Sequence, residues 1–82
     1  MKTKVGVKDS LTLDLHGAYH EDVKGQLDRF LYEHMLNANP AVKVITGKSE
    51  KMKEIVGDIL SEYGFEYKED FLNSGSITVF IR

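Results

Sequence analysis

Apolar and polar side chains alternate over residues 11–16, and the run ends at Gly17. A period of two is typical of a strand that is buried on one face only. The three leucines of this run would point into a core, and Asp14 and His16 would share the open face, about 7 Å apart along the strand. The pattern therefore predicts a strand that carries a carboxylate and an imidazole to its end.

Two stretches have the spacing of amphipathic helices, residues 19–36 and residues 50–63. The first ends before Pro40, and the second has Ser49 as its expected N-cap and Gly64 as the expected left-handed residue after it. The β-branched run 42–46 between them predicts a second strand, parallel to the first. We expect His34 on the solvated side of the first helix. The apolar face of this first helix is expected to comprise Val23, Leu27, Phe30, Leu31 and Met35.

Residues 65–69 and 76–82 alternate again, with turn-forming residues at Asn73-Ser74-Gly75. The predicted fold class is α/β, a two-layer βαβαββ sandwich whose four-stranded mixed sheet carries both helices on one face. Residues 1–10 are expected to be a polar lead-in or a weak extra edge strand, and residues 11–82 the domain. The expected core includes Leu13, Leu15, Val44, Ile55, Ile59, Val79 and Ile81. The expected open face of the sheet carries Thr12, Asp14, His16, Lys43, Glu66, Lys68, Thr78, Phe80 and Arg82.

Length and composition limit the class of protein to which this sequence can belong. A chain of 82 residues forms one small domain, and the absence of cysteine excludes disulfides and thiolate metal sites. No apolar run follows Met1, so we expect no signal peptide, no membrane contact and a cytoplasmic location. The net charge of −2 means that any binding to nucleic acid needs a locally basic patch.

The segment Gly47-Lys48-Ser49 has the form of the end of a P-loop. A P-loop needs a glycine five positions before Gly47, and Val42 stands there, inside a predicted strand. Nucleotide binding is therefore rejected. This segment and the helix start behind it could instead hold a single phosphate, with added charge from Lys48 and Lys51. The alternative is an ordinary capped helix start.

The pair Asp14 and His16 suits acid–base chemistry, with the imidazole as general acid or base and the carboxylate as its orienting group. RNA cleavage of this kind needs no metal, whereas DNA cleavage with a carboxylate usually involves a divalent ion. In the alternative interpretation, Asp14 caps the turn and His16 hydrogen-bonds to the loop after the second strand.

His20 follows His16 by four residues, which suggests a metal site with Asp14. Such spacing is common by chance, so we predict no metal site. A cofactor of the Mg or Mn type is compatible with Asp14 but is not indicated by the sequence. Phe80, among basic residues of the open face, could stack on a base. The acidic residues at 66, 69 and 70 argue against that face, and the edge formed by the two strand ends is the preferred surface.

Three segments together resemble one family. Leu13-Asp14-Leu15-His16-Gly17 resembles the LDxHG signature of small MutS-related (Smr) domains. Residues 44–49 resemble the second motif of that family, [HT]-G-x-G, and residues 74–79 are similar to its terminal glycine-rich strand. The resemblance implies a fold similar to the C-terminal domain of a bacterial translation initiation factor. It also implies a domain that binds nucleic acid or acts on DNA or RNA as an endonuclease.

The resemblance also implies roles for individual residues. Asp14 and His16 match the positions linked to cleavage, and residues 46–49 match the loop linked to substrate contact. Ser49 stands where the family has its second glycine, and the loop is shorter than usual, which removes flexibility and amide donors from the place where a phosphate would be held. The residues expected to contact nucleic acid are Gly17, Thr46, Gly47, Lys48, Ser49 and Lys51.

Three functions remain open from the sequence. The first is an endonuclease that needs Asp14 and His16 close together and accessible to solvent. The second is a nucleic-acid-binding or ribosome-binding module without catalysis. The third is a protein-interaction domain, which the net negative charge favours slightly. RNA and DNA are not distinguished.

Overall fold

A computed structural model describes residues 6–9, 11–70 and 75–81, and within them the chain forms five strands and two helices. The elements are β1 (Gly6–Asp9), β2 (Thr12–Asp14), α1 (His20–Leu36), β3 (Ala41–Ile45), α2 (Glu50–Tyr63), β4 (Glu66–Glu69) and β5 (Ser76–Phe80). Three sequence-based expectations lie outside the described residues: the turn at Asn73 and Ser74, the position of Arg82, and residues 1–5 and 10 of the lead-in.

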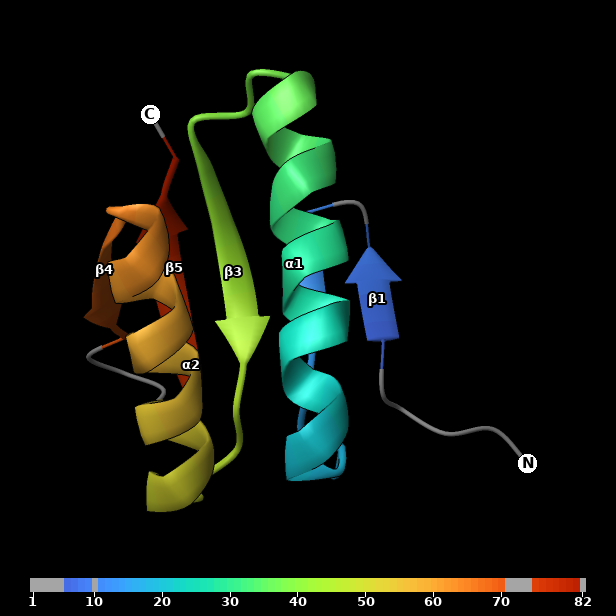
Figure 1. Cartoon of the computed structure of the whole chain (residues 1–82), viewed down its shortest axis with the longest axis vertical. Helices are drawn as coiled ribbons and strands as arrows, with labels where there is room; N and C mark the ends of the chain where they lie inside the picture. The colour runs from blue at the N-terminus through green and yellow to red at the C-terminus, as the bar shows by residue number, and fades with distance from the viewer. Residues whose placement is uncertain (1–5, 10, 71–74, 82) are drawn as a thin grey trace.

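The strands form one mixed sheet in the order β1-β2-β3-β5-β4. The strands β2 and β3 are parallel, with Leu13 opposite Val44, and the other neighbouring pairs are antiparallel. Both helices lie side by side over the same face of the sheet (Figure 1). The predicted α/β sandwich with its βαβαββ order is therefore confirmed.

The sheet has one more strand than the four predicted. Residues Gly6–Asp9 pair with β2 as an antiparallel edge strand, with Gly6 opposite Asp14 and Val7 opposite Leu13. The pairing has an irregularity between Val7 and Asp9. Of the two interpretations given to the N-terminal segment, the extra edge strand is the one the structure shows for these four residues. As a result, β2 lies inside the sheet and not at its edge.

The core lies between the sheet and the two helices and contains six of the seven predicted residues, while Ile55 is half-buried against it. Two expectations for α1 are wrong. Met35 is 43% exposed, whereas His34 is only 4% exposed. The His34 ring packs edge-on against Phe30, with centroids 4.5 Å apart, and its Nδ1 lies 2.7 Å from Nδ2 of Asn39. This hydrogen bond provides the polar partner that a buried imidazole needs.

Both helices end in the same hydrogen-bonded turn. After α2, the amide of Phe65 donates to the Leu60 carbonyl, and Gly64 adopts the expected left-handed conformation, with φ of 80°. After α1, the amide of Asn39 donates to the His34 carbonyl, and the left-handed position is filled by Ala38, with φ of 58°. This is the Schellman arrangement, and a side chain at its left-handed position is strained. Neither helix in the described part of the chain is long and apolar enough to cross a membrane.

Candidate functional site

The candidate site is the strand-end edge, which we define as residues 14–20 and 46–51. It contains the end of β2, the loop that follows β3 and the starts of α1 and α2, all at the same side of the molecule (Figure 1). The amide of Leu15 donates to the Ile45 carbonyl at 2.8 Å, so the pairing of β2 with β3 continues up to this edge. Ligands of α/β sheets bind at such carboxyl ends, and the two helix starts add partial positive charge there.

Asp14 is buried at this edge and not open to solvent. It is only 5% exposed, and its Oδ1 accepts a hydrogen bond from the backbone amide of His16 at 2.9 Å. The predicted open-face position of Asp14 is therefore wrong. The strand ends at Asp14 itself, and the carboxylate turns back onto the next residues, as aspartates commonly do in turns. The interpretation of Asp14 as a turn cap is the one that the geometry shows.

His16 is exposed and lies against Gly47 from the neighbouring loop. A Cβ added to Gly47 would lie 3.2 Å from Cδ2 of His16, which is tighter than an ordinary van der Waals contact. Gly47 also has a φ of +71°, a conformation that glycine adopts without strain. The nitrogens of the imidazole have no hydrogen-bond partner within residues 6–9, 11–70 and 75–81, so the predicted bond to this loop is absent there. The ring therefore lies against the second motif, and its nitrogens are not engaged by the described part of the chain.

Thr46 and the amide of Gly47 hold the loop after β3 to Gly75, the residue before β5. Both amides donate to the Gly75 carbonyl, at 2.8 Å from Thr46 and 3.0 Å from Gly47. The Thr46 side chain is buried, and its Oγ1 lies 2.8 Å from the Gly47 carbonyl oxygen and 3.3 Å from that of Gly75. These groups were expected to contact nucleic acid. Because the fold already uses them, their contribution to the edge is to hold the loop in place.

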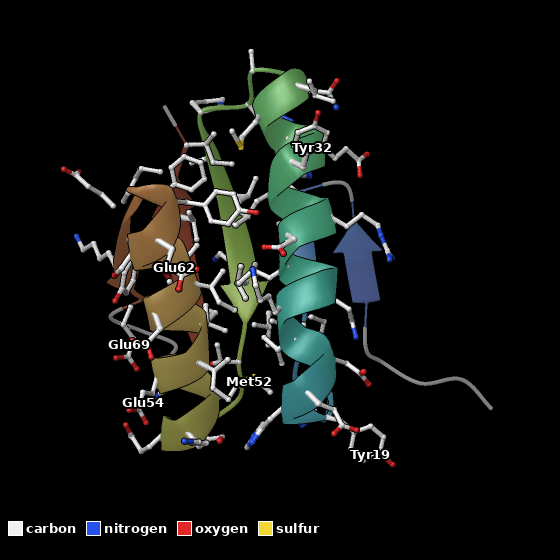
Figure 2. The ribbon with its side chains drawn as sticks, viewed as in Figure 1. Tyr19, Tyr32, Met52, Glu54, Glu62 and Glu69 are labelled. Atoms are coloured by element: carbon white, nitrogen blue, oxygen red, sulfur yellow. The ribbon has the colours of Figure 1, made fainter. Side chains whose placement is uncertain are left out.

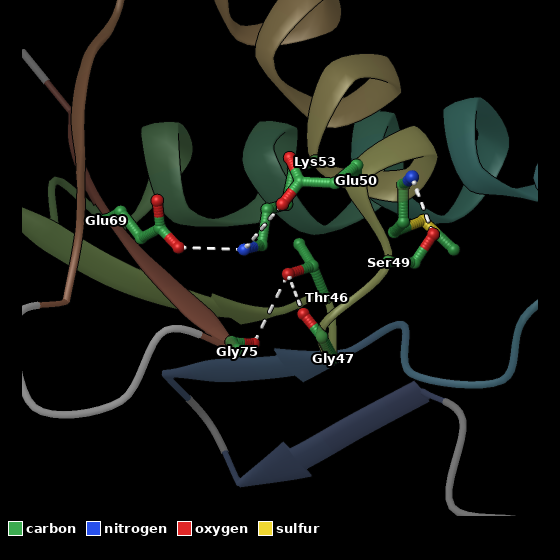
Figure 3. A network of polar contacts seen from close by, with 8 residues as sticks. Thr46, Gly47, Ser49, Glu50, Lys53, Glu69 and Gly75 are labelled. Atoms are coloured by element: carbon green, nitrogen blue, oxygen red, sulfur yellow. Dashed lines mark hydrogen bonds and ion pairs between the residues drawn. The ribbon is translucent and has the colours of Figure 1, made fainter.

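The start of α2 presents exposed cations. Ser49 caps the helix as predicted, since its Oγ accepts from the Met52 amide at 3.1 Å. Lys48 and Lys51 are exposed and form no ion pair within the described residues. Lys53 differs, because its Nζ lies 2.9 Å from Oε2 of Glu69 (Figure 3), and this hydrogen bond raises the pKa of Lys53. The positive charge available to a ligand at this helix start therefore comes from Lys48 and Lys51.

The start of α1 is different in character. Gly17 has a φ of +86° and is exposed, which allows the sharp turn after β2. Tyr19 follows at the N-cap position and is 74% exposed, and His20 is also exposed. Tyr19 is not among the site residues predicted from the sequence. The available signal was a large aromatic residue at a position where helices prefer Ser, Thr, Asp or Asn.

The open face of the sheet is a weaker candidate. Lys43 lies 3.2 Å from Oδ2 of Asp70, and Asp70 also accepts hydrogen bonds from Ser76 and Thr78. The bond from Ser76, followed by those from Thr78 and Lys43, lowers the pKa of Asp70, so the carboxylate stays charged. The positive charge of Lys43, one of the basic residues around Phe80 on this face, is thus neutralised by an acid. Within the described residues, no group of three His, Cys, Asp or Glu side chains is placed to hold a metal ion.

Comparison with known proteins agrees with this architecture. The family model of the Smr domain matches residues 13–75, a range that includes the edge and both helices. No match was found among curated proteins.

Solved structures of three Smr proteins are similar to this chain. The stand-alone small MutS-related protein YdaL from Escherichia coli superposes with a TM-score of 0.84 at 19% identity, over 90% of this chain and 66% of YdaL. The Smr domain of Thermus thermophilus MutS2 has a TM-score of 0.79 at 16% identity, over 87% of this chain and 96% of that domain. The SMR domain of NEDD4-binding protein 2 has a TM-score of 0.72 at 25% identity, over 98% and 94%.

Proposed function

The chain belongs to the Smr domain family, and from this premise we propose that it binds nucleic acid at the strand-end edge. We also propose that it cleaves RNA slowly, with His16 as the group that accepts the proton. The observation that carries the proposal is the contact between the exposed imidazole of His16 and Gly47. This contact joins the two family motifs at the edge where the lysines and both helix starts lie. Family membership supports nucleic-acid binding in general, and the finer assignments rest on this geometry.

Binding is proposed to come from the start of α2. Lys48 and Lys51 supply charge, and the first-turn amides of a helix have no partner within the helix itself. Together they suit up to about three contacts with backbone phosphates. The opposing features are the net charge of −2 and Glu50 in the same turn. We therefore expect weak binding that salt readily disrupts.

RNA is the favoured substrate because of the position of Asp14. RNA carries its own nucleophile, the 2′-hydroxyl, and a base that removes its proton is sufficient for attack. DNA lacks this group and needs an activated water, for which a carboxylate usually holds a divalent ion. The Asp14 carboxylate is buried and bonded to the His16 amide, so it faces the protein and not a substrate.

The proposed step is an internal transesterification. A neutral imidazole nitrogen of His16 accepts the proton of the 2′-hydroxyl as the 2′-oxygen forms a bond to phosphorus. The bond between phosphorus and the 5′-oxygen breaks, and the leaving oxygen takes a proton from water. The products are a 2′,3′-cyclic phosphate and a 5′-hydroxyl end. Asp14 acts here as a positioning residue, because it fixes the backbone from which the imidazole projects.

A gel assay with three labelled ligands tests this proposal: single-stranded RNA, the same strand with 2′-O-methyl groups, and duplex DNA. We expect slow cleavage of the RNA to cyclic-phosphate ends, and binding without cleavage of the methylated strand. Cleavage of the methylated strand or of the DNA at an equal rate would overturn the proposed nucleophile. Absence of binding to all three ligands at low salt would remove nucleic acid as the partner.

The second candidate function is binding without cleavage. The burial of Asp14 favours it, because the sequence-based nuclease hypothesis required both motif residues to be accessible. Cleavage by the parent separates the two candidates, and two substitutions test the role of Asp14. Asp14→Asn keeps an oxygen that can accept from the His16 amide, so cleavage should be largely retained, whereas Asp14→Ala removes it and should slow cleavage. An equal loss of cleavage in both variants would assign a direct role to the carboxylate. Absence of cleavage by the parent would mean that the domain binds nucleic acid without cleaving it.

A further inference from the structure

Tyr19 occupies a position that the fold does not need it to fill. It is the N-cap of α1, and its side chain makes no capping hydrogen bond. Small polar residues are preferred there because their oxygen accepts from a first-turn amide. The apolar contact that often fixes a helix start is made by the preceding residue, since Ala18 packs against the core cluster that contains Val23. The aromatic ring therefore adds neither a cap nor core packing.

The ring of Tyr19 is presented to solvent at the strand-end edge. It is 74% exposed, more than any other large hydrophobic side chain that the structure describes. Figure 2 shows it projecting from the first turn of α1, at the end opposite to Tyr32. With Ala18, His20 and Glu21 it lines a shallow hollow of about 320 Å³, which is at the small end of the range for ligand pockets.

The charges around Tyr19 differ from those at the start of α2. The first turn of α1 carries the exposed acids Glu21 and Asp22, which repel a phosphate at close range. The start of α2 carries Lys48 and Lys51, which attract one. A ligand that covers both helix starts would thus place a neutral flat group on Tyr19 and its phosphate on the lysines.

We propose that Tyr19 is a stacking platform for an unpaired nucleobase and that it makes the domain selective for single-stranded nucleic acid. This inference rests on the proposed function and extends it to the choice of ligand. Bases stack on aromatic side chains whatever their sequence, but in a duplex both faces of each base are covered by its neighbours. Tyr19 follows His16 by three residues, so their Cα atoms lie at most roughly 11 Å apart. A base close to the phosphodiester at His16 is therefore within reach of the ring.

The test compares Tyr19→Asn with Tyr32→Asn in otherwise intact protein. Tyr32 is a matched control, since it is an exposed tyrosine of the same helix, 62% exposed, at the other end (Figure 2). Asparagine is a good N-cap, so Tyr19→Asn should keep or raise the melting temperature, and lost binding would not reflect unfolding. The ligands are a short labelled single strand, the same strand with abasic units in place of nucleotides, and a duplex of the same sequence.

We expect Tyr19→Asn to weaken binding to the normal single strand by about 5- to 150-fold, the range for loss of one stacked base. Binding to the abasic strand and to the duplex should be unchanged by this substitution, and Tyr32→Asn should leave all three affinities unaltered. Equal affinity of Tyr19→Asn and the parent for the normal single strand would overturn the stacking role, even though nucleic-acid binding by the parent would stand. Failure of the parent to bind any of the three ligands would instead overturn the proposed function itself.

Discussion

The imidazole of His16 lies so close to Gly47 that a Cβ on that glycine would be only 3.2 Å from Cδ2 of the ring. His16 follows β2 and Gly47 follows β3, two strands that are parallel neighbours in the sheet. The turn that places His16 is fixed by Asp14, and the loop that places Gly47 is fixed by the Gly75 carbonyl. The contact therefore depends on the sheet as a whole, and it sets where the imidazole can reach.

Replacing Gly47 tests this contact. We expect Gly47→Ala to lower the free energy of unfolding by about 1–2 kcal/mol, because alanine is strained at a φ of +71°. The new Cβ would also displace His16, and cleavage should fall by about 10-fold, since small misplacements of a catalytic group are costly. Gly64→Ala is the matched control: it has a φ of +80° with nothing within 4 Å of its Cβ, so it should lose similar stability and no activity. Equal cleavage by the Gly47→Ala and Gly64→Ala variants would show that the contact does not position His16.

Replacing Ala38 by glycine should stabilise the turn at the end of α1. It occupies the left-handed position of the Schellman turn with a φ of 58°, where the equivalent residue after α2 is Gly64. We expect Ala38→Gly to raise the free energy of unfolding by about 1 kcal/mol, since glycine removes the strain. Urea unfolding of the two proteins measures the difference. A variant that is less stable than the parent would mean that the strain at Ala38 is smaller than the entropy that glycine loses on folding.

We expect the protein to lose stability at alkaline pH because of Tyr63. Its hydroxyl donates to Oδ1 of Asp28 at 2.8 Å, and burial, followed by this bond, raises the pKa of Tyr63 to about 12. A tyrosine in the unfolded chain has a pKa of about 10. A raised folded-state pKa gives stability that is fully present below pH about 10 and is lost as the pH rises toward 12. Tyr63→Phe should remove this part of the alkaline loss, and identical pH profiles of the two proteins would contradict the assignment.

Salt dependence tests which lysines contact phosphate. With roughly three phosphate contacts, log K should fall against log salt concentration with a slope of about −2 to −3. Lys48→Ala and Lys51→Ala should each make the slope shallower by about 1. Lys68→Ala is the control, because Lys68 is exposed on β4 and is not one of the residues of the strand-end edge. A larger effect at Lys68 than at Lys48 would move the binding surface to the open face of the sheet.

The hydrophobic pattern predicted the helices and the order of the strands, because the buried leucines and valines recur at the period of each element. The pattern predicted burial less well at positions where a polar residue is buried. His34 follows Leu27, Phe30 and Leu31 at helical spacing, and that spacing already indicated burial. The polarity of the imidazole favours the solvated side, and the partner that makes its burial tolerable, Asn39, lies beyond the helix.

The site was predictable in its location and less so in its details. The parallel pairing of β2 and β3 follows from the crossover rule, and it brings His16 beside Gly47 as expected. The burial of Asp14 was not predictable from alternation, because the strand stops at this residue and the carboxylate bonds to the backbone two residues ahead. The internal use of Thr46 depends on Gly75, a partner far along the chain.

The proposed role of His16 is tested most sharply by cleavage of single-stranded RNA by a His16→Ala variant, measured beside its affinity for the same strand. The imidazole is assigned to proton transfer, while Lys48 and Lys51 supply the affinity. We therefore expect a folded His16→Ala protein to bind within a few-fold of the parent and no longer to cleave. A folded His16→Ala variant that cleaves RNA as fast as the parent would contradict it.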